Sequence, residues 1–302
     1  MPNARLYFLI TRTPLHIGCG DSLGDIDKPV LRGTVTGHPL VPGTEVKGCL
    51  KEPATEHWFS GGPEQRNDCA KSLFGREGPG GTGMLCPQDA ELLLLPVACW
   101  AGGWAWATSP AVLHRLRRKA IGCGLPAAPP AVPQPAHTEQ AVLASDKSLV
   151  SRFDGGKHLI LSEAVLDAAV DPLATEWADW LVKHAWHGED SAWCGLARQR
   201  LAIVHDEVFD WLAETAMDVR SHNKIGPDGV VADNHLWRQE YVPEDAVFAG
   251  VMAVQPVAGN PAGYTVGQAL AVPTDCDLQL GGRASVGFGW ASLRPVPLGG
   301  RA

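Results

Sequence analysis

The chain has 302 residues, and an apolar content of 45% allows one large domain or two small ones with a real core. Its 34 glycines and 24 prolines exclude a coiled coil or a long helical bundle and favour short elements joined by many turns. The net charge of −8 argues against a generic nucleic-acid binder, but residues 162–215 hold eleven Asp and Glu against three Lys and Arg, so the remainder is neutral.

The cysteines and the apolar stretches predict a cytoplasmic protein without a membrane anchor. None of the eight cysteines forms a C-x-x-C pair, and a chain of this length does not depend on disulfides. The segment after Met1 carries no signal-peptide cleavage pattern. Residues 92–113 are uncharged and long enough to span a bilayer, but Pro96 and Pro110 favour two buried strands joined by a turn.

The first part of the chain alternates strand-like and helical segments. The aromatic and β-branched run at 5–11 predicts a strand, and the glycines and prolines at 60–83 predict a loop. A helix is predicted to begin at Thr44, which would be its N-cap, with Lys47 in its first turn. Further strands are expected at 30–35, 84–86, 90–97 and 104–108, and a helix with a basic face at 111–120.

The middle of the chain reads as a loop followed by helices. Residues 122–146 contain five prolines and no helical period, which is typical of a linker or a long surface loop. Helices are predicted at 172–186, after the capping pair Asp171-Pro172, and at 205–217. The acidic excess of this region is expected on their outer faces.

A β-hairpin is predicted after these helices. The strand-like segments 220–225 and 234–241 flank the turn residues 226–229, Gly-Pro-Asp-Gly. Trp237 lies among polar residues of the second segment, where an aromatic ring is suited to wedge against a nucleobase.

Two glycine-rich segments, 18–24 and 281–289, lie near opposite ends of the chain. Glycine lets a backbone approach a phosphate and expose its N–H donors, although tight turns are the simpler interpretation of either segment alone. Lys47 at a helix start and Arg283 inside the second segment add cations, a combination expected at a phosphate-binding site.

Asp25 and Asp27 are two carboxylates close in sequence to His16. In an extended segment both point to one face, where they can hold a divalent metal or position an attacking oxygen. A solvated turn before Pro29 is the alternative.

A possible zinc site comprises His184, His187 and Cys194. The histidines have helical spacing, but no fourth ligand stands at a suitable position. Helix packing is therefore the favoured interpretation.

Six motifs follow one another along most of the chain: Thr13–Gly18, Ile26–Arg32, Val41–Gly48, Leu73–Gly75 with Asp89-Ala90, Trp237–Pro243 and Leu280–Trp290. In this order they resemble the motifs of the RAMP superfamily of CRISPR proteins, and most closely those of the backbone subunits of type III-B (Cmr) effector complexes. Any one motif is weak, whereas the ordered set is specific. Lys28, where an apolar residue is expected, and Gln239, where the family motif has Glu, depart from the pattern.

The resemblance implies an α+β fold. It consists of a modified RNA-recognition, ferredoxin-like palm with an antiparallel sheet, an inserted helical region and a β-hairpin thumb. The whole of 1–302 would be one RAMP domain. Its parts would be the palm at 1–121 and 240–302, the Pro-rich loop at 122–146, the helical insertion at 147–218 and the thumb at 219–239.

The resemblance also implies a subunit that binds CRISPR RNA and stacks with copies of itself, beside other Cmr subunits. It would cleave complementary target RNA at regular intervals. Asp27, as ligand of Mg²⁺ or Mn²⁺, and His16 would be catalytic, with Asp25 as a second candidate. The implied RNA-binding residues are Gly18, Gly20, Arg32, Thr44, Lys47, Gly282, Arg283, Gly287 and Gly289. The implied thumb residues are Asn223, Ile225, Leu236, Trp237, Glu240 and Tyr241.

Three alternatives stay open. The chain is a guide-RNA scaffold without an active site if Asp27→Ala leaves target cleavage unchanged. It is a stand-alone CRISPR-RNA processing endonuclease, with His16 as general base, if the isolated protein cuts repeat RNA without metal. The backbone subunit of a type III-A complex shares the expected fold, although the stretch 239–243, Gln-Glu-Tyr-Val-Pro, favours type III-B.

Overall fold

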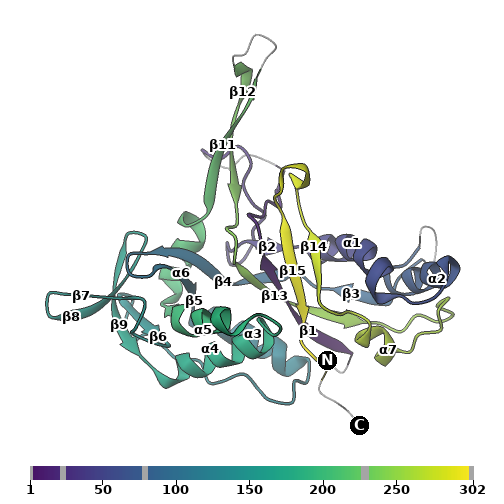
Figure 1. Cartoon of the computed structure of the whole chain (residues 1–302), viewed down its shortest axis with the longest axis horizontal. Helices are drawn as coiled ribbons and strands as arrows, with labels where there is room; N and C mark the ends of the chain where they lie inside the picture. The colour runs from purple at the N-terminus through teal and green to yellow at the C-terminus, as the bar shows by residue number, and fades with distance from the viewer. Residues whose placement is uncertain (1–2, 21–24, 77–80, 226–230, 299–302) are drawn as a thin grey trace.

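The computed structural model describes residues 3–20, 25–76, 81–225 and 231–298, apart from the side chains of 224–235, as a mixed α/β molecule (Figure 1). A 13-stranded sheet runs through the body, and a separate two-stranded sheet projects from it. The polar residues of interest lie where the two sheets meet.

The central, antiparallel part of the large sheet is built around β1 (Ala4–Thr11), whose residues are nearly all buried. β1 lies between β13 (Val247–Val254) and β15 (Trp290–Pro295), and β4 (Ala90–Cys99) pairs with the other edge of β13. Because both faces of β1 are covered, its residues 6–10 form a continuous apolar run rather than an alternating one. Shorter strands extend this part: β14 (Cys276–Gln279) on β15, β3 (Leu85–Pro87) on β13 and β2 (Leu40–Val41) on β4.

Beyond β4 the sheet closes on itself. From β4 the strand order runs through β5 (Gly103–Thr108), β10 (Leu201–Val204), β6 (Gln140–Leu143), β9 (Ala164–Val170) and β8 (Gly156–Leu161). Cys99 of β4 then pairs with Leu161 of β8. β7 (Val150–Phe153) pairs with β8 outside this ring. Closure covers strand edges that would otherwise be open to pairing with another chain.

Helices cover the sheet in two groups, on opposite sides of Figure 1. The first comprises α1 (Gly43–Pro53), which continues as a π-helical turn at Ala54–Trp58, α2 (Pro63–Phe74) and α7 (Val266–Ala271). The second comprises α3 (Pro110–Gly122), α4 (Pro172–His184), α5 (Ser191–Arg200) and α6 (Asp206–Thr215). A short 3-10 turn, Ala284–Val286, lies in the second glycine-rich segment.

The two-stranded sheet is a hairpin of β11 (Asp218–Ile225) and β12 (Val231–Tyr241) that projects from the body (Figure 1). Its antiparallel register runs from Asp218 opposite Tyr241 to Ile225 opposite Val231, with an irregularity between Asn223 and Ile225. The predicted hairpin is therefore confirmed, and its predicted turn at 226–229 lies outside the described residues.

Several other predicted elements are confirmed, among them the strand at 5–11 and the helices at 111–120 and 172–186. The cap at Asp171 is confirmed too, because its side chain accepts a hydrogen bond of 2.7 Å from the Leu173 N–H. The uncharged segment 92–113 forms β4, β5 and the first turn of α3. Within the described residues no helix is both long and apolar enough to cross a bilayer, and no disulfide joins the cysteines.

Three local predictions are wrong. Residues 60–83 are not all loop, since α2 fills 63–74, with Pro63 at its first position where a missing N–H costs nothing. Thr44 is not an N-cap, because α1 begins at Gly43 and Pro42 takes the capping position. Residues 30–35 form isolated bridges and a turn rather than a strand.

The middle of the chain differs most from the expected helical insertion. Residues 147–218 contain α4, α5 and α6, but they also contain β7 to β10, and β6 lies inside the Pro-rich stretch 122–146. β10 is buried at all four of its positions, so it shows none of the alternation that marks a half-exposed strand. Short strands inside a closed ring are for this reason hard to recognise in sequence.

Candidate functional site

The base of the hairpin is fastened to a segment from the N-terminal part of the chain. Residues 25–32 run beside β12, where the Lys28 N–H donates to the Arg238 carbonyl at 3.1 Å. The Glu240 N–H donates in turn to the Lys28 carbonyl at 3.0 Å, and Lys28 and Gln239 form a parallel bridge. The segment that carries the predicted carboxylates is thus positioned by the hairpin.

Asp27 is exposed, and its Oδ2 accepts a hydrogen bond of 2.7 Å from the Arg238 N–H. This bond orients the carboxylate and leaves Oδ1 without a hydrogen-bond partner among the described residues. Asp25 is also exposed and makes no hydrogen bond or ion pair within the described part of the chain. Asp27 is therefore the better positioned of the two candidates.

His16 is buried, with its Nδ1 2.8 Å from the Glu240 carbonyl oxygen. A carbonyl only accepts, so Nδ1 carries the hydrogen, and Nε2 of the neutral ring keeps its lone pair. Burial lowers the pKa of His16; the bond to the Glu240 carbonyl opposes this effect, whereas Lys28 and Arg283 add to it. At neutral pH the ring is thus neutral, and its Nε2 has no hydrogen-bond partner among the described residues.

The Glu240 side chain is buried and makes two hydrogen bonds. Its Oε2 accepts from the Val30 N–H at 2.8 Å, and its Oε1 accepts from the Arg32 guanidinium at 2.6 Å. Arg32 also donates to the carbonyls of Ala213 and Gly37, each at 2.9 Å. Because these contacts occupy the guanidinium, they favour an anchoring role for Arg32 over the predicted contact with RNA.

The two glycine-rich segments meet at His16. The Gly282 N–H donates to the His16 carbonyl at 3.0 Å, and a Cβ on Gly281, at φ +65°, would stand 2.2 Å from the same oxygen. A Cβ on Gly18 would stand 2.9 Å from His16 Nε2. At Gly281, where the close atom belongs to the backbone and φ is positive, only glycine fits without a shift of the chain. The other predicted loop glycines, Gly20, Gly287 and Gly289, all have positive φ.

Arg283, in the second glycine-rich segment, contacts the hairpin. It is a non-glycine residue with φ +67°, a conformation that costs on the order of 1 kcal/mol and persists where surrounding contacts hold it. Its Nε donates to Gln239 Oε1 at 3.1 Å, and its guanidinium lies 5.5 Å from the Trp237 ring centroid. Lys28 Nζ lies 4.9 Å from the same centroid, so two cations are attracted to Trp237.

A second aromatic group adjoins the first, and of its members only Tyr241 was singled out from the sequence. Tyr241 stacks on Phe288 at 4.9 Å, and the Arg220 guanidinium lies 5.1 Å from the Phe288 centroid. His222 Nε2 is 2.9 Å from the Tyr241 hydroxyl. Cross-strand register puts Arg220 and His222 on the hairpin face that carries Gln239, Trp237 and Tyr241. Period-two alternation along β11 is the signal that would have singled them out.

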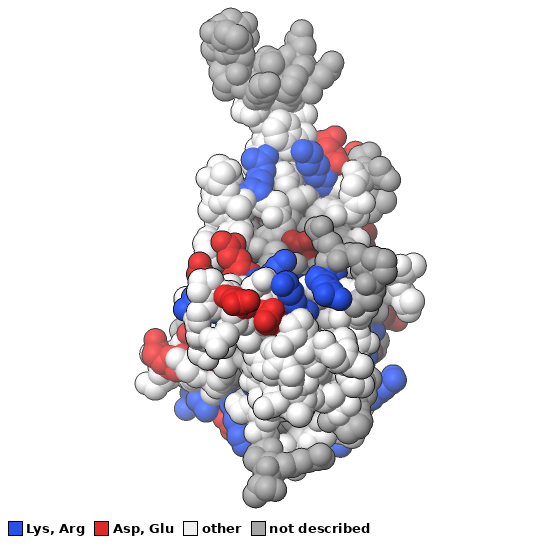
Figure 2. Space-filling view, turned by 90° about the vertical axis from the view of Figure 1, so that its right-hand side faces the viewer, with Lys and Arg blue, Asp and Glu red and all other residues white. Residues whose placement is uncertain are grey.

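The N-terminus of α1 also reaches the second glycine-rich segment. Glu45 Oε1 accepts a hydrogen bond of 2.8 Å from the Gly281 N–H. Thr44 is exposed, and Lys47 is partly exposed and makes no hydrogen bond or ion pair with any described residue. On the face that bears α1, Lys and Arg side chains gather below the hairpin, with Asp and Glu beside them (Figure 2). Lys47 is therefore available to an anion.

The six predicted thumb residues separate into two groups. Asn223 and Leu236 are opposite each other on the projecting part and are exposed, Leu236 by 68%. Glu240 and Tyr241 are buried at the hairpin base beside His16, and Trp237 is half-buried between the groups. The side chain of Ile225 lies outside the described residues.

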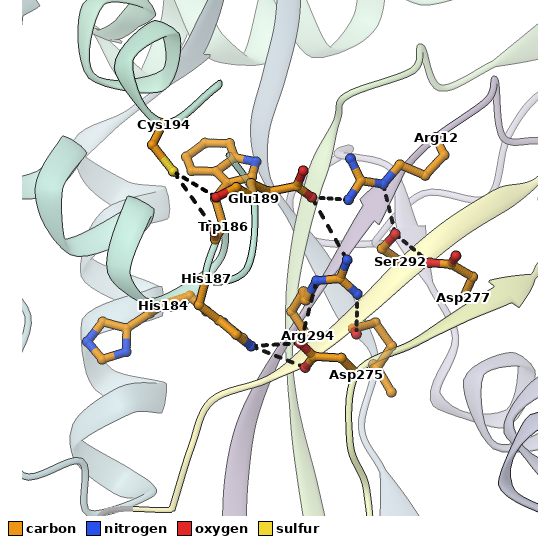
Figure 3. Close-up of polar contacts among 11 residues, drawn as sticks. Arg12, His184, Trp186, His187, Glu189, Cys194, Asp275, Asp277, Ser292 and Arg294 are labelled. Carbon is orange, nitrogen blue, oxygen red and sulfur yellow. Dashed lines mark hydrogen bonds and ion pairs between the residues drawn. The ribbon is translucent and has the colours of Figure 1, made fainter. Parts of the chain in front are cut away.

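His184, His187 and Cys194 do not form a metal site. His187 Nε2 bonds to Asp275 at 3.1 Å, whereas the His184 ring points away from that contact (Figure 3). Cys194 faces the carbonyls of Trp186 and Glu189. In the part of the chain that the structure describes, no three His, Cys, Asp or Glu are placed to hold a metal ion. The helix-packing interpretation agrees with this arrangement.

These residues border an ion-pair network that joins the loop after α4 to the sheet (Figure 3). Glu189 pairs with Arg12 and lies 3.9 Å from Arg294, and Arg294 lies 3.9 Å from Asp275. Asp275 completes the chain through its contact with His187. The network ties two groups of elements that are distant in sequence.

A metal at Asp27 must take most of its ligands from outside the protein. Asp27 offers one carboxylate oxygen without a partner, and no cluster of three ligands exists among the described residues. Mg²⁺ is commonly bound in this way, by one or two carboxylates together with substrate phosphates and water. The residues fit a metal that arrives with a phosphate-bearing substrate.

Comparison with known proteins finds one family model, described as the RAMP superfamily, that matches residues 8–292. The chain is 28% identical over 295 residues to the CRISPR system Cmr endoribonuclease Cmr4 of Pyrococcus furiosus, covering 96% of this chain and 95% of that protein. It is 31% identical over 93 residues to the CRISPR system Cms endoribonuclease Csm3 of Mycobacterium tuberculosis, covering 28% of this chain and 39% of that protein.

Solved structures share the fold. The crystal structure of oligomeric Cmr4 from Pyrococcus furiosus matches with a TM-score of 0.68 at 24% identity and covers 98% of this chain and 99% of that one. A chain of the type III-B Cmr-beta complex bound to cognate target RNA matches with a TM-score of 0.70 at 18% identity and covers 97% of this chain and 96% of that one.

Proposed function

The chain belongs to the RAMP superfamily, and from that membership we propose that it is the backbone subunit of a type III-B CRISPR effector complex. In this role it binds CRISPR RNA, stacks with copies of itself and other Cmr subunits, and cleaves complementary target RNA. The observation that carries the proposal is the exposed Asp27 carboxylate beside the same hairpin base that holds the neutral His16 ring.

The match along the whole chain favours type III-B over type III-A. The relative named Cmr4 is matched over 96% of this chain, whereas the relative named Csm3 is matched over 28%. A match of that length includes both glycine-rich segments and the hairpin.

The strand order β15-β1-β13-β4 supports a ferredoxin-like palm. Helices α1 and α2 lie between β1 and β4 in sequence, and α7 lies between β13 and β15, which gives a β-α-β-β-α-β pattern. The projecting hairpin is the thumb. The exposed Leu236 on it is an apolar wedge suited to displace one guide–target base pair.

Guide phosphates bind along the second glycine-rich segment and α1. Gly282, Gly287 and Gly289 bring backbone close to the ligand, and Lys47 and Arg283 supply charge. Thr44 at the first turn of α1, with Gly18 and Gly20, completes this surface. The protein then needs no base-specific contacts, because base pairing with the guide reads the target sequence.

Cleavage uses the 2′-hydroxyl of the target ribose. His16 Nε2 accepts the hydroxyl proton, which makes the oxygen a stronger nucleophile toward the adjacent phosphorus. Asp27 is the residue that would hold Mg²⁺ or Mn²⁺ together with the target phosphate. Such an ion, when bound, supplies charge stabilisation to the phosphoryl oxygens.

The test compares wild type with Asp27→Ala in the complex assembled with partner subunits and a CRISPR RNA. End-labelled complementary RNA and Mg²⁺ or Mn²⁺ are added. We expect a regular ladder of products that Asp27→Ala reduces at least about a hundredfold while target binding is retained. Asp25→Ala is the matched control and should keep the ladder. A ladder that survives Asp27→Ala moves catalysis elsewhere, and tight binding without any ladder identifies a scaffold.

A further inference from the structure

We propose that His222 is the general acid of this site and protonates the 5′-oxygen that leaves when target RNA is cut. The inference rests on the proposed function, because it assigns a further residue to the same reaction. His222 lies on β11, across the hairpin from Trp237. No motif in the sequence marks it.

His222 and His16 share one neighbour, Tyr241. The His16 ring lies 5.6 Å from the Tyr241 ring, and the His222 ring lies 6.0 Å from it, with Nε2 2.9 Å from the tyrosine hydroxyl. Cleavage by a 2′-hydroxyl needs one group that accepts its proton and another that gives a proton to the leaving oxygen. The structure places two imidazoles beside the same tyrosine, one for each of these roles.

Two contacts fix the His222 ring. Trp237 stacks on it at 5.7 Å with an interplanar angle of 28°, and Tyr241 holds Nε2. Nδ1 has no hydrogen-bond partner among the described residues. In the protonated ring Nε2–H donates to the tyrosine oxygen, so Nδ1–H is the proton available to substrate.

The charged groups that face His222 come from three segments. Burial lowers the pKa of His222, and Arg283, Arg220 and Lys28 lower it further. Tyr241 is the other titratable neighbour, and burial raises its pKa against the opposite effect of the two arginines. A target phosphate bound among the three cations brings negative charge, which favours the protonated imidazole in the bound complex.

The proton transfers balance. The 2′-oxygen gives its proton to His16 Nε2 and forms a bond to phosphorus. The bond from phosphorus to the 5′-oxygen breaks, and that oxygen takes the proton from His222 Nδ1. The products are a 2′,3′-cyclic phosphate and a 5′-hydroxyl, and no oxidant or reductant is required.

The test uses His222→Gln in the assembled complex with guide and target RNA. We expect the single-turnover rate to fall by a factor of about 10² to 10⁴ with target affinity unchanged. The wild-type rate should decline as the pH rises through the pKa of His222 in the bound complex, and the variant should lack that decline. His158→Gln is the matched control, since His158 lies on β8, outside the hairpin base, and should cut at the wild-type rate.

A second substrate separates an acid from a structural residue. A target with sulfur in place of the 5′-bridging oxygen has a leaving group that needs no proton, so His222→Gln should cut it within a few-fold of wild type. Equal slowing on both substrates, or a wild-type rate on the ordinary target, overturns the assignment of His222. If the wild-type complex cuts neither substrate, the proposed function itself fails.

Discussion

Glu240 is the residue at which three segments of the chain meet. Its carboxylate binds Val30 and Arg32, and its carbonyl holds His16. Glu240→Gln leaves the Arg32 charge without its buried partner, so we expect the free energy of unfolding to fall by about 3 kcal/mol. Urea unfolding of the isolated chain measures this loss.

Asp218→Asn is the control for that substitution. Asp218 pairs with Arg220 on the hairpin, where both side chains are substantially exposed, and exposed pairs contribute roughly 0–1 kcal/mol. Equal losses for Asp218→Asn and Glu240→Gln contradict the anchoring role of Glu240.

Individual site residues could be predicted from the sequence where they belong to a motif. Residues that reach the site only through strand register could not. His16, Asp27, Arg283 and the glycines stand in recognisable patterns, and the structure brings His16, Arg283 and the glycines together. His222 joins them only because β11 pairs with β12 in one register, which a single sequence does not specify. The anchoring role of Arg32 likewise needs the position of Glu240.

The network around Glu189 is the clearest link between elements. It ties the loop after α4 to the residue that follows β1, Arg12, and to Arg294 of β15. We expect Glu189→Gln to lower the free energy of unfolding by about 1–2 kcal/mol, because both arginines lose a partly buried partner. Hydrogen exchange of the α4–α5 loop should quicken as that loop separates from the sheet.

Asp179→Asn serves as the comparison for this network. Asp179 pairs with Arg198 between α4 and α5, where both side chains are about half exposed. Its removal should leave exchange in the α4–α5 loop unchanged. If both substitutions change hydrogen exchange in the α4–α5 loop equally, the Glu189 network does not hold that loop against the sheet.

Elements were predictable where one face is polar or a cap is present. The spacing of Trp177 and Trp180 after Asp171 identifies α4, and two strand-like segments on either side of the sequence Gly-Pro-Asp-Gly identify the hairpin. The strands of the closed ring are short. Because β10 is buried at every position, its sequence shows neither the period of two typical of a half-exposed strand nor the period of 3.6 typical of a helix. Their existence follows from tertiary pairing, which local sequence does not report.

Over the whole molecule, positive charge is gathered at one surface although the net charge is negative. The net charge is −8, yet Lys28, Lys47, Arg220 and Arg283 gather at the hairpin base and α1. If these four cations contact phosphates, the affinity of the isolated chain for single-stranded RNA should fall with salt with a log–log slope of about −3. Lys47→Gln should reduce the slope by about 0.7. A slope near zero would contradict phosphate binding at this surface.

The position of β1 has a consequence for biosynthesis. Its two partners, β13 and β15, come from residues 247–254 and 290–295, at the other end of the chain. At ribosomal rates of about 5–20 residues per second, β1 waits roughly 10–60 s after emerging before both edges are paired. During that interval the run Leu-Tyr-Phe-Leu-Ile is an exposed, aggregation-prone apolar segment. We therefore expect the nascent chain to bind a ribosome-associated chaperone.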